Sequence, residues 1–153
     1  MNCDTLTSVQ PYSPGGKLSA ESSGLNLRCR ILVADDDSVI RRLVSLFLTD
    51  EDFAVVAVSD GEQAWDALNH DDYDLLVTDN EMPCLTGIHL IARIRKRGIQ
   101  LPVIMISSTF APENLHDHPD LEIAAVITKP FGRLEILNAV RNVLFGPAGS
   151  SMT

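Results

Sequence analysis

Residues 73–83 read YDLLVTDNEMP, and this stretch decides the fold. An apolar run of strand length, Asp74–Thr78, leads into the acidic residue Asp79 and then into a loop that contains Pro83. On both sides of it, short apolar runs alternate with segments of helical period. That alternation is typical of βα units around a parallel sheet. We therefore expect an α/β domain with one strand that ends at Asp79.

The same pattern predicts the other elements. Four further strands are expected, at Arg30–Ala34, Phe53–Val58, Pro102–Ile106 and Ala124–Thr128. Good N-cap residues mark the starts of three helices, and these are Asp37 or Ser38, Asp60 and Thr86. Only a short helix fits between Pro112 and Pro119, because proline breaks a helix interior. The last predicted helix is Arg133–Phe145, with an inward face made of Leu134, Leu137, Val140 and Leu144.

The remaining residues fall into two tails. Residues 1–28 are rich in Ser, Gly and Pro and show neither a helical nor a strand period, which predicts a disordered segment. Residues 147–153 are predicted to form a second disordered tail. The domain itself then spans residues 29–146, a length that suits one compact unit.

Charge and cysteine content exclude several classes of protein. The net charge of −9 makes the chain a poor candidate for direct nucleic-acid binding. No apolar run approaches the roughly 20 residues that span a bilayer, and no secretory signal is evident, so we expect no membrane insertion. The 3 cysteines form no C-x-x-C pair, which argues against a zinc ribbon or a disulfide scaffold and suits a reducing compartment. We expect a cytoplasmic protein.

Polar residues stand at the carboxyl ends of the predicted strands, namely Asp35-Asp36-Asp37, Asp79, Ser107-Ser108 and Lys129-Pro130. Each group alone has an ordinary explanation, such as helix capping for the acidic triplet. Because the ends of parallel strands lie at one edge of a sheet, we expect the groups to converge. Two like charges 4 Å apart repel by about 4 kcal/mol at an effective dielectric of 20. Such a site needs a cation, and carboxylate oxygens favour Mg²⁺.

The chain resembles the receiver domain of two-component response regulators over about residues 30–145. The resemblance is carried by ILVADDD at 31–37, YDLLVTDNEMP at 73–83, Gly87, PVIMISS at 102–108 and KPF at 129–131. It implies a CheY-like, flavodoxin-like fold, in which a doubly wound, five-stranded parallel sheet of order 2-1-3-4-5 forms the middle of a three-layer sandwich.

The resemblance also implies the metal site. Asp35 and Asp36 match the Mg²⁺-binding acids of the family, with Asp36 the more direct ligand. Asp79 and the backbone carbonyl of Glu81 would complete the protein's share of the ligands. Mg²⁺ is the one cofactor implied.

The phosphoryl chemistry follows from the same resemblance. Asp79 matches the phosphoacceptor, Ser107 the hydroxyl that bonds the phosphoryl group, and Lys129 the lysine that pairs with it. The Lys129–Pro130 bond is expected to be cis. The implied function is a single-domain response regulator. It would accept a phosphoryl group from a sensor histidine kinase or a phosphotransfer protein and signal by contact with an unidentified downstream protein. It would not be an enzyme beyond Mg²⁺-dependent self-phosphorylation and autodephosphorylation.

The chain departs from the family's pattern in three places. Val126 stands where the family usually has an aromatic switch residue, and Cys84 stands where it often has glycine. The predicted fourth helix is short and bounded by Pro119. Since valine has neither a ring nor a hydroxyl to relocate, we expect the loop Ser108–Phe110 to carry the response to phosphorylation instead.

Two other functions stay open at this stage. A haloacid-dehalogenase-like phosphohydrolase also uses a strand-end aspartate, a hydroxyl, a lysine and Mg²⁺. It would need a further acidic pair after Lys129, where only Glu135 occurs, and it would leave Asp79 without a role. An interaction module that never takes phosphate is the second alternative. A nucleotide-binding enzyme is disfavoured, because neither G-x-G-x-x-G nor a Walker loop occurs.

Overall fold

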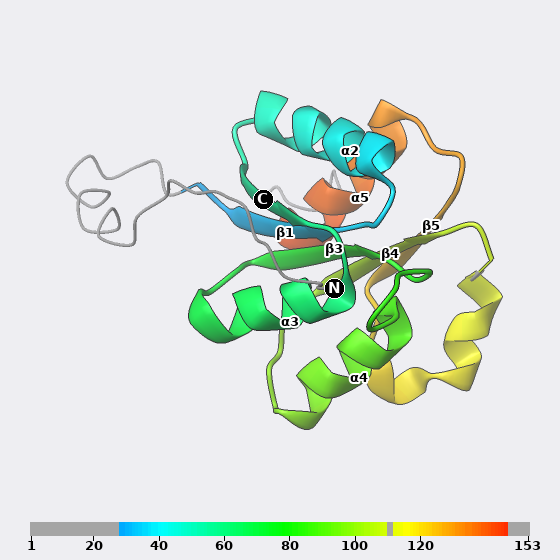
Figure 1. Ribbon diagram of the computed structural model, residues 1–153. Helices are drawn as coiled ribbons and strands as arrows, with labels where there is room; N and C mark the ends of the chain where they lie inside the picture. The colour runs from blue at the N-terminus through cyan, green and yellow to red at the C-terminus, as the bar shows by residue number, and fades with distance from the viewer. Residues whose placement is uncertain (1–27, 110–111, 147–153) are drawn as a thin grey trace.

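A computed structural model describes residues 28–109 and 112–146 of the protein (Figure 1). The two predicted tails therefore lie outside the described residues, apart from Arg28, and so does Phe110. The order of elements along the chain is βαβαβαβ, then two 3₁₀ turns, then a final strand and helix. Outside the segment between β4 and β5, this order is the one that the alternating sequence pattern predicts.

The centre of the molecule is a five-stranded, all-parallel sheet in the order β2-β1-β3-β4-β5. The prediction of an α/β doubly wound fold with the order 2-1-3-4-5 is confirmed. Four of the five strands begin one residue later than predicted, and β3 and β4 include the polar residues Asp79 and Ser107 as their last members. The strands are β1 (Arg30–Ala34), β2 (Ala54–Val58), β3 (Leu75–Asp79), β4 (Val103–Ser107) and β5 (Ala125–Thr128).

Helices cover both faces of the sheet (Figure 1). On one face, α2 (Ser38–Asp50) and α5 (Arg133–Phe145) bury Val44, Leu48, Ile136 and Val140 against β1, β3 and β4. On the other face, α3 (Gly61–His70) and α4 (Gly87–Lys96) bury Ala64, Leu90, Ile91 and Ile94. Among the described residues, no helix has both the length and the apolar character that crossing a membrane requires.

The predicted N-caps are confirmed for three helices. The side chains of Asp37, Asp60 and Thr86 accept hydrogen bonds from backbone N–H groups in the first turns of α2, α3 and α4. These bonds satisfy donors that a helix start otherwise leaves unpaired. One prediction about α5 is wrong, because Leu134 is 71% exposed rather than inward-facing. It lies in the first turn, where the helix extends past the edge of the hydrophobic core formed by its later residues.

The segment between β4 and β5 differs from the predicted short helix. It forms two 3₁₀ helices, η1 (Pro112–Asp117) and η2 (Pro119–Leu121), because six residues before a second proline are too few to stabilise an α-helix. The guanidinium of Arg95 on α4 holds the end of this segment. It donates to the backbone oxygens of Leu121 (2.8 Å), Ile99 (3.0 Å) and Glu122 (3.2 Å).

Gly87 allows α4 to begin directly against the end of β3. A Cβ atom at this position would lie 2.5 Å from the backbone oxygen of Asp79 and 2.9 Å from the Cα atom of Asn80. Both are backbone atoms, which cannot rotate away. The side chain of Asn80 also accepts a hydrogen bond from the N–H of Ile88, at 3.0 Å. The helix start and the strand end therefore form one tightly packed unit.

The substitution Gly87→Ala should destabilise the fold by about 1–3 kcal/mol, the usual cost of forcing extra atoms into a packed site. Urea unfolding followed by circular dichroism measures the change. Gly132→Ala is the matched control, because a Cβ there meets no atom within 4 Å, and its effect should be smaller. Equal midpoints for Gly87→Ala and the wild type would show that the close approach carries no such cost.

Candidate functional site

The carboxyl ends of four strands bring the predicted site residues to one edge of the sheet. Asp35 follows β1 directly, Asp79 is the last residue of β3, Ser107 is the last of β4, and Lys129 follows β5. Pairing places Asp79 beside Ile106, and Ser107 beside Thr128, so the side chains share one level of the sheet. The Lys129–Pro130 peptide bond is cis, as the resemblance implied.

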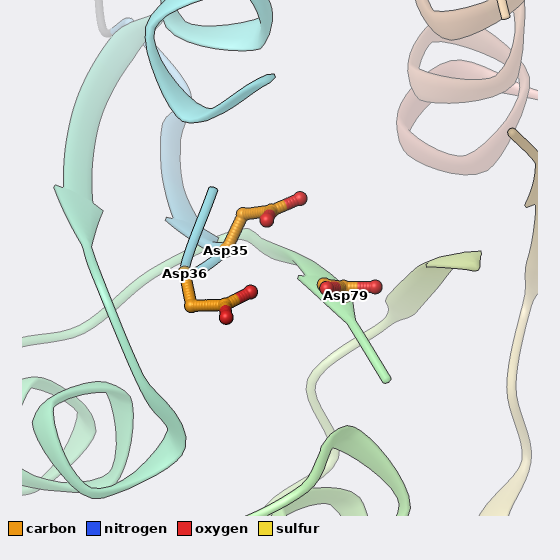
Figure 2. Close-up of side chains that lie close together, drawn as sticks. All are labelled: Asp35, Asp36 and Asp79. Atoms are coloured by element: carbon orange, nitrogen blue, oxygen red, sulfur yellow. The ribbon is translucent and has the colours of Figure 1, made fainter. Parts of the chain in front are cut away.

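Three carboxylates converge at this edge (Figure 2). One oxygen from each of Asp35, Asp36 and Asp79 lies within 4.8 Å of the others. Asp35 and Asp79 are each only 3% exposed, whereas Asp36 is exposed to solvent. An all-oxygen donor set with one open side suits a hard cation that keeps part of its water shell, such as Mg²⁺. The residues present therefore fit the implied metal.

The acidic triplet that follows β1 divides into separate tasks. Asp37 is the N-cap of α2, since its carboxylate accepts from the N–H groups of Val39 and Ile40. The carboxylate of Asp35 accepts from the N–H of Asp37 at 2.9 Å, which fixes it facing the site. The capping explanation is thus correct for one of the three acids, and Asp35 and Asp36 are left for the cluster.

Lys129 is the cation that the described residues themselves supply. Its Nζ atom lies 3.5 Å from Oδ2 of Asp35 and 3.4 Å from Oδ1 of Asp79. These distances describe ion pairs with loose hydrogen-bond geometry, and Oδ1 of Asp79 is fully buried without a hydrogen-bond partner. A single ammonium therefore faces a buried pair of carboxylates that it cannot fully neutralise.

The pKa values reflect this excess of negative charge. Burial and the neighbouring carboxylate of Asp35 raise the pKa of Asp79 to about 6, although Lys129 opposes the shift. Burial likewise raises the pKa of Asp35. For Lys129, burial alone would lower the pKa, but the two aspartates outweigh it and the net shift is upward. Lys129 therefore stays protonated at neutral pH.

The hydroxyl of Ser107 faces an unexpected partner. Its Oγ atom donates to the carboxylate of Glu81, at 3.0 Å from Oε2 and 3.3 Å from Oε1. Thr109 donates to the same Oε2 from 2.5 Å. These hydrogen bonds, set against partial burial that acts in the opposite direction, hold the pKa of the Glu81 carboxyl below its usual value.

The side chain of Glu81 and the hydroxyl of Thr109 are the site residues that the sequence did not indicate. Glu81 was expected to act only through its backbone carbonyl. Thr109 was expected only as part of a responsive loop. Both residues lie beyond their strands, where the direction of a side chain depends on the loop. The one available signal was the pairing of an acid two residues after Asp79 with a hydroxyl two residues after Ser107.

Comparison with known proteins decides the family. The family model described as "Response regulator receiver domain" matches residues 31–141. This chain belongs to that family. The matched range includes every site residue named above.

Similar proteins agree with this receiver assignment. Response regulator RppA of Synechocystis sp. is 34% identical over 114 residues, which cover 73% of this chain and 49% of RppA. The receiver domain of the Francisella response regulator 1452 has 32% identity and a TM-score of 0.68, and the match covers 74% of this chain and 94% of that domain. The receiver domain of the Pseudomonas aeruginosa sensor kinase PA1611, described with a magnesium ion in its active-site cleft, shares the fold at 23% identity and a TM-score of 0.68, over 76% of this chain and 98% of that domain.

The matched proteins are often longer than this chain. The chain spans about half the length of the curated bacterial response regulators that it matches, with 49%, 46% and 48% covered in three of them. What an entire regulator does is therefore a separate question from what this domain does.

The raised pKa of Asp79 predicts a pH-dependent stability in metal-free protein. The folded state binds the proton more tightly than the unfolded state, whose aspartate has a pKa near 3.8. The stabilisation is therefore full below 3.8 and is lost as the pH rises through about 6. Asp79→Asn, which removes the buried charge, should raise the free energy of unfolding at pH 7.5 and raise it less at pH 5.

Urea unfolding in the presence of EDTA at the two pH values measures this difference. Asp72→Asn, which removes an exposed carboxylate outside the cluster, is the control and should show no such pH dependence. An Asp79→Asn effect of equal size at both pH values would contradict the assigned electrostatics.

Proposed function

We propose that this receiver domain accepts a phosphoryl group on the carboxylate of Asp79 in a Mg²⁺-dependent reaction. The single observation that supports it best is the convergence of Asp35, Asp36 and Asp79 with Lys129 at the strand ends. Like charges are kept together there at a cost in free energy, and raised pKa values are typical of functional sites. Membership of the receiver family supports the same proposal.

Asp79, Lys129 and Ser107 would each have a separate role in the phosphoryl transfer. An oxygen of the Asp79 carboxylate forms the new bond to phosphorus as the bond between phosphorus and the donor's leaving atom breaks, and the electron pair leaves with the donor. Lys129 pairs with the negative charge that the phosphoryl oxygens bring. Ser107 would donate its hydroxyl hydrogen to a phosphoryl oxygen. The burial of Asp79 excludes bulk water, which slows hydrolysis of the acyl phosphate.

Magnesium would be held by Asp35, Asp36, Asp79 and the backbone carbonyl of Glu81. When bound, it supplies positive charge to the transferring phosphoryl group. Asp36 is the one carboxylate of the three that solvent reaches, which gives the ion an entry route.

The proposed donor is a sensor histidine kinase or a phosphotransfer protein, and the output is a phosphorylation-dependent contact with a downstream protein. The domain would catalyse nothing beyond its own phosphorylation and dephosphorylation. The alternative of a haloacid-dehalogenase-like phosphohydrolase is disfavoured by Glu135. That carboxylate accepts from the N–H of Gly132 at 2.9 Å, so it supports the start of α5 and not the acidic cluster.

Asp79 should be the sole phosphoacceptor, because it alone among the clustered acids ends the central strand, with Asp35, Asp36 and Lys129 placed around it. Wild type and Asp79→Asn are incubated with acetyl phosphate and Mg²⁺, and the incorporated phosphate is measured by intact-mass spectrometry. The wild type should gain one phosphate and the variant none. Equal incorporation in both would place the acceptor elsewhere, and none in the wild type would favour a phosphorylation-independent interaction module.

Mg²⁺ binding should depend on Asp36 and Asp79, because their carboxylates form the open side and the buried side of the cluster. Isothermal calorimetry of Asp36→Ala should show a loss of affinity of roughly tenfold or more, in line with removal of a direct ligand. Glu62→Gln, which removes a negative charge from the surface of α3, should bind like the wild type. Unchanged affinity in Asp36→Ala would place the metal at another position.

A further inference from the structure

Glu81, Ser107 and Thr109 form a hydrogen-bonded group, which we call the Glu81 latch. Of its three side chains, the proposed phosphoryl chemistry uses only Ser107. The carboxylate accepts from both hydroxyls, through Oε2 at 3.0 Å from Ser107 and 2.5 Å from Thr109. The N–H of Thr109 in turn donates to Oγ of Ser107 at 3.0 Å. The latch thus joins the loop after β3 to the end of β4.

Within the latch, Ser107 already donates the hydroxyl hydrogen that a phosphoryl group on Asp79 would accept. A serine hydroxyl carries one hydrogen and can donate it to one acceptor. In the structure Ser107 directs its donation toward Glu81. A phosphoryl group on Asp79 can accept from Ser107 only after that bond is given up. The two acceptors therefore compete for the same donor.

Charge strengthens the competition. A phosphoryl group adds about −1.5 to −2 charges and three acceptor oxygens to Asp79. Glu81 is an anion two residues away along the chain, held in place by hydrogen bonds to the same hydroxyls. Hydrogen bonds to a carboxylate are about twice as strong as those to a neutral acceptor. If the Glu81 carboxylate turns away, its hydrogen bonds to Ser107 and Thr109 are lost. If it stays, its negative charge remains close to that of the phosphoryl group.

The loop backbone does not depend on the latch. The carbonyl of Asn80 accepts from the N–H of Gly87 and its side chain accepts from the N–H of Ile88, each at 3.0 Å. These bonds fix the residue before Glu81 against the start of α4. The side chain of Glu81 can therefore turn away while its backbone carbonyl stays in place.

We propose that the Glu81 side chain is a built-in competitor of the phosphoryl group for Ser107, and that it shifts the domain toward the unphosphorylated state. This inference rests on the proposed function, because it requires an acceptor at Asp79. The two parts of Glu81 would then act in opposite directions. Its carboxylate would disfavour the phosphorylated state, whereas its backbone carbonyl would help to hold the Mg²⁺ that phosphorylation requires.

The test compares affinities for beryllofluoride, a phosphoryl mimic, in the presence of saturating Mg²⁺. Glu81→Gln keeps the shape and an acceptor oxygen but removes the charge. It should bind beryllofluoride roughly three- to tenfold more tightly than the wild type, because a charged hydrogen bond no longer competes. Glu62→Gln is the charge-matched control on α3 and should bind like the wild type.

A double-mutant cycle tests whether the effect passes through Ser107. Alanine at position 107 has no hydroxyl for which the two acceptors could compete. In a Ser107→Ala background, Glu81→Gln should therefore change the affinity for beryllofluoride by less than twofold. Thr109→Val removes one of the two anchors of Glu81 and should give a smaller gain than Glu81→Gln. A gain from Glu81→Gln that is unchanged in the Ser107→Ala background would overturn the competition.

The outcomes separate this inference from the proposed function. Wild type that binds beryllofluoride while Glu81→Gln binds it equally or more weakly would overturn the latch and leave phosphorylation of Asp79 standing. Wild type that binds none and takes no phosphate from acetyl phosphate would overturn the proposed function, and the latch with it. A weaker affinity of Glu81→Gln for Mg²⁺ alone would assign the carboxylate to the metal instead.

Discussion

The rest of the site depends on the burial of two carboxylates, Asp35 and Asp79, beside the single ammonium of Lys129. In water this arrangement would be inexpensive, but the low dielectric of the strand ends strengthens each repulsion. The excess negative charge explains the raised pKa of Asp79 and the fit of a hard cation. A group that brings negative charge can then be accepted only together with positive charge.

The sheet enforces this proximity. Asp79 ends β3, the central strand, and β1 and β4 pair with it on either side. With helices packed on both faces, no strand can shift without opening a hydrophobic core. The close approach of Gly87 fixes the loop after β3 as well. The energy that holds the charged side chains together therefore comes from apolar packing elsewhere.

The sequence predicted the regular parts because their signals are local and repeated. Strand order came from the family resemblance, and the caps at Asp37, Asp60 and Thr86 follow from the residues themselves. Leu134 was placed wrongly because helical period shows which side of a helix is apolar, but not where the core ends. The contact of Glu81 with Ser107 joins two loops far apart in the chain, and no periodicity encodes such a contact.

Because Val126 stands where the family usually has an aromatic switch residue, the hydrogen bonds of the Glu81 latch matter more for the response of this domain. Val126 pairs with Met105 in the sheet and packs against the core, and it offers no hydroxyl and no ring to respond to Ser107. We therefore expect a change at Ser107 to act on Thr109, its direct hydrogen-bond partner. The segment that follows Thr109 is held at its far end by Arg95, through the carbonyls of Leu121 and Glu122. Of the described residues, η1 and η2 lie between the latch and the guanidinium, and we expect the response there rather than in β5.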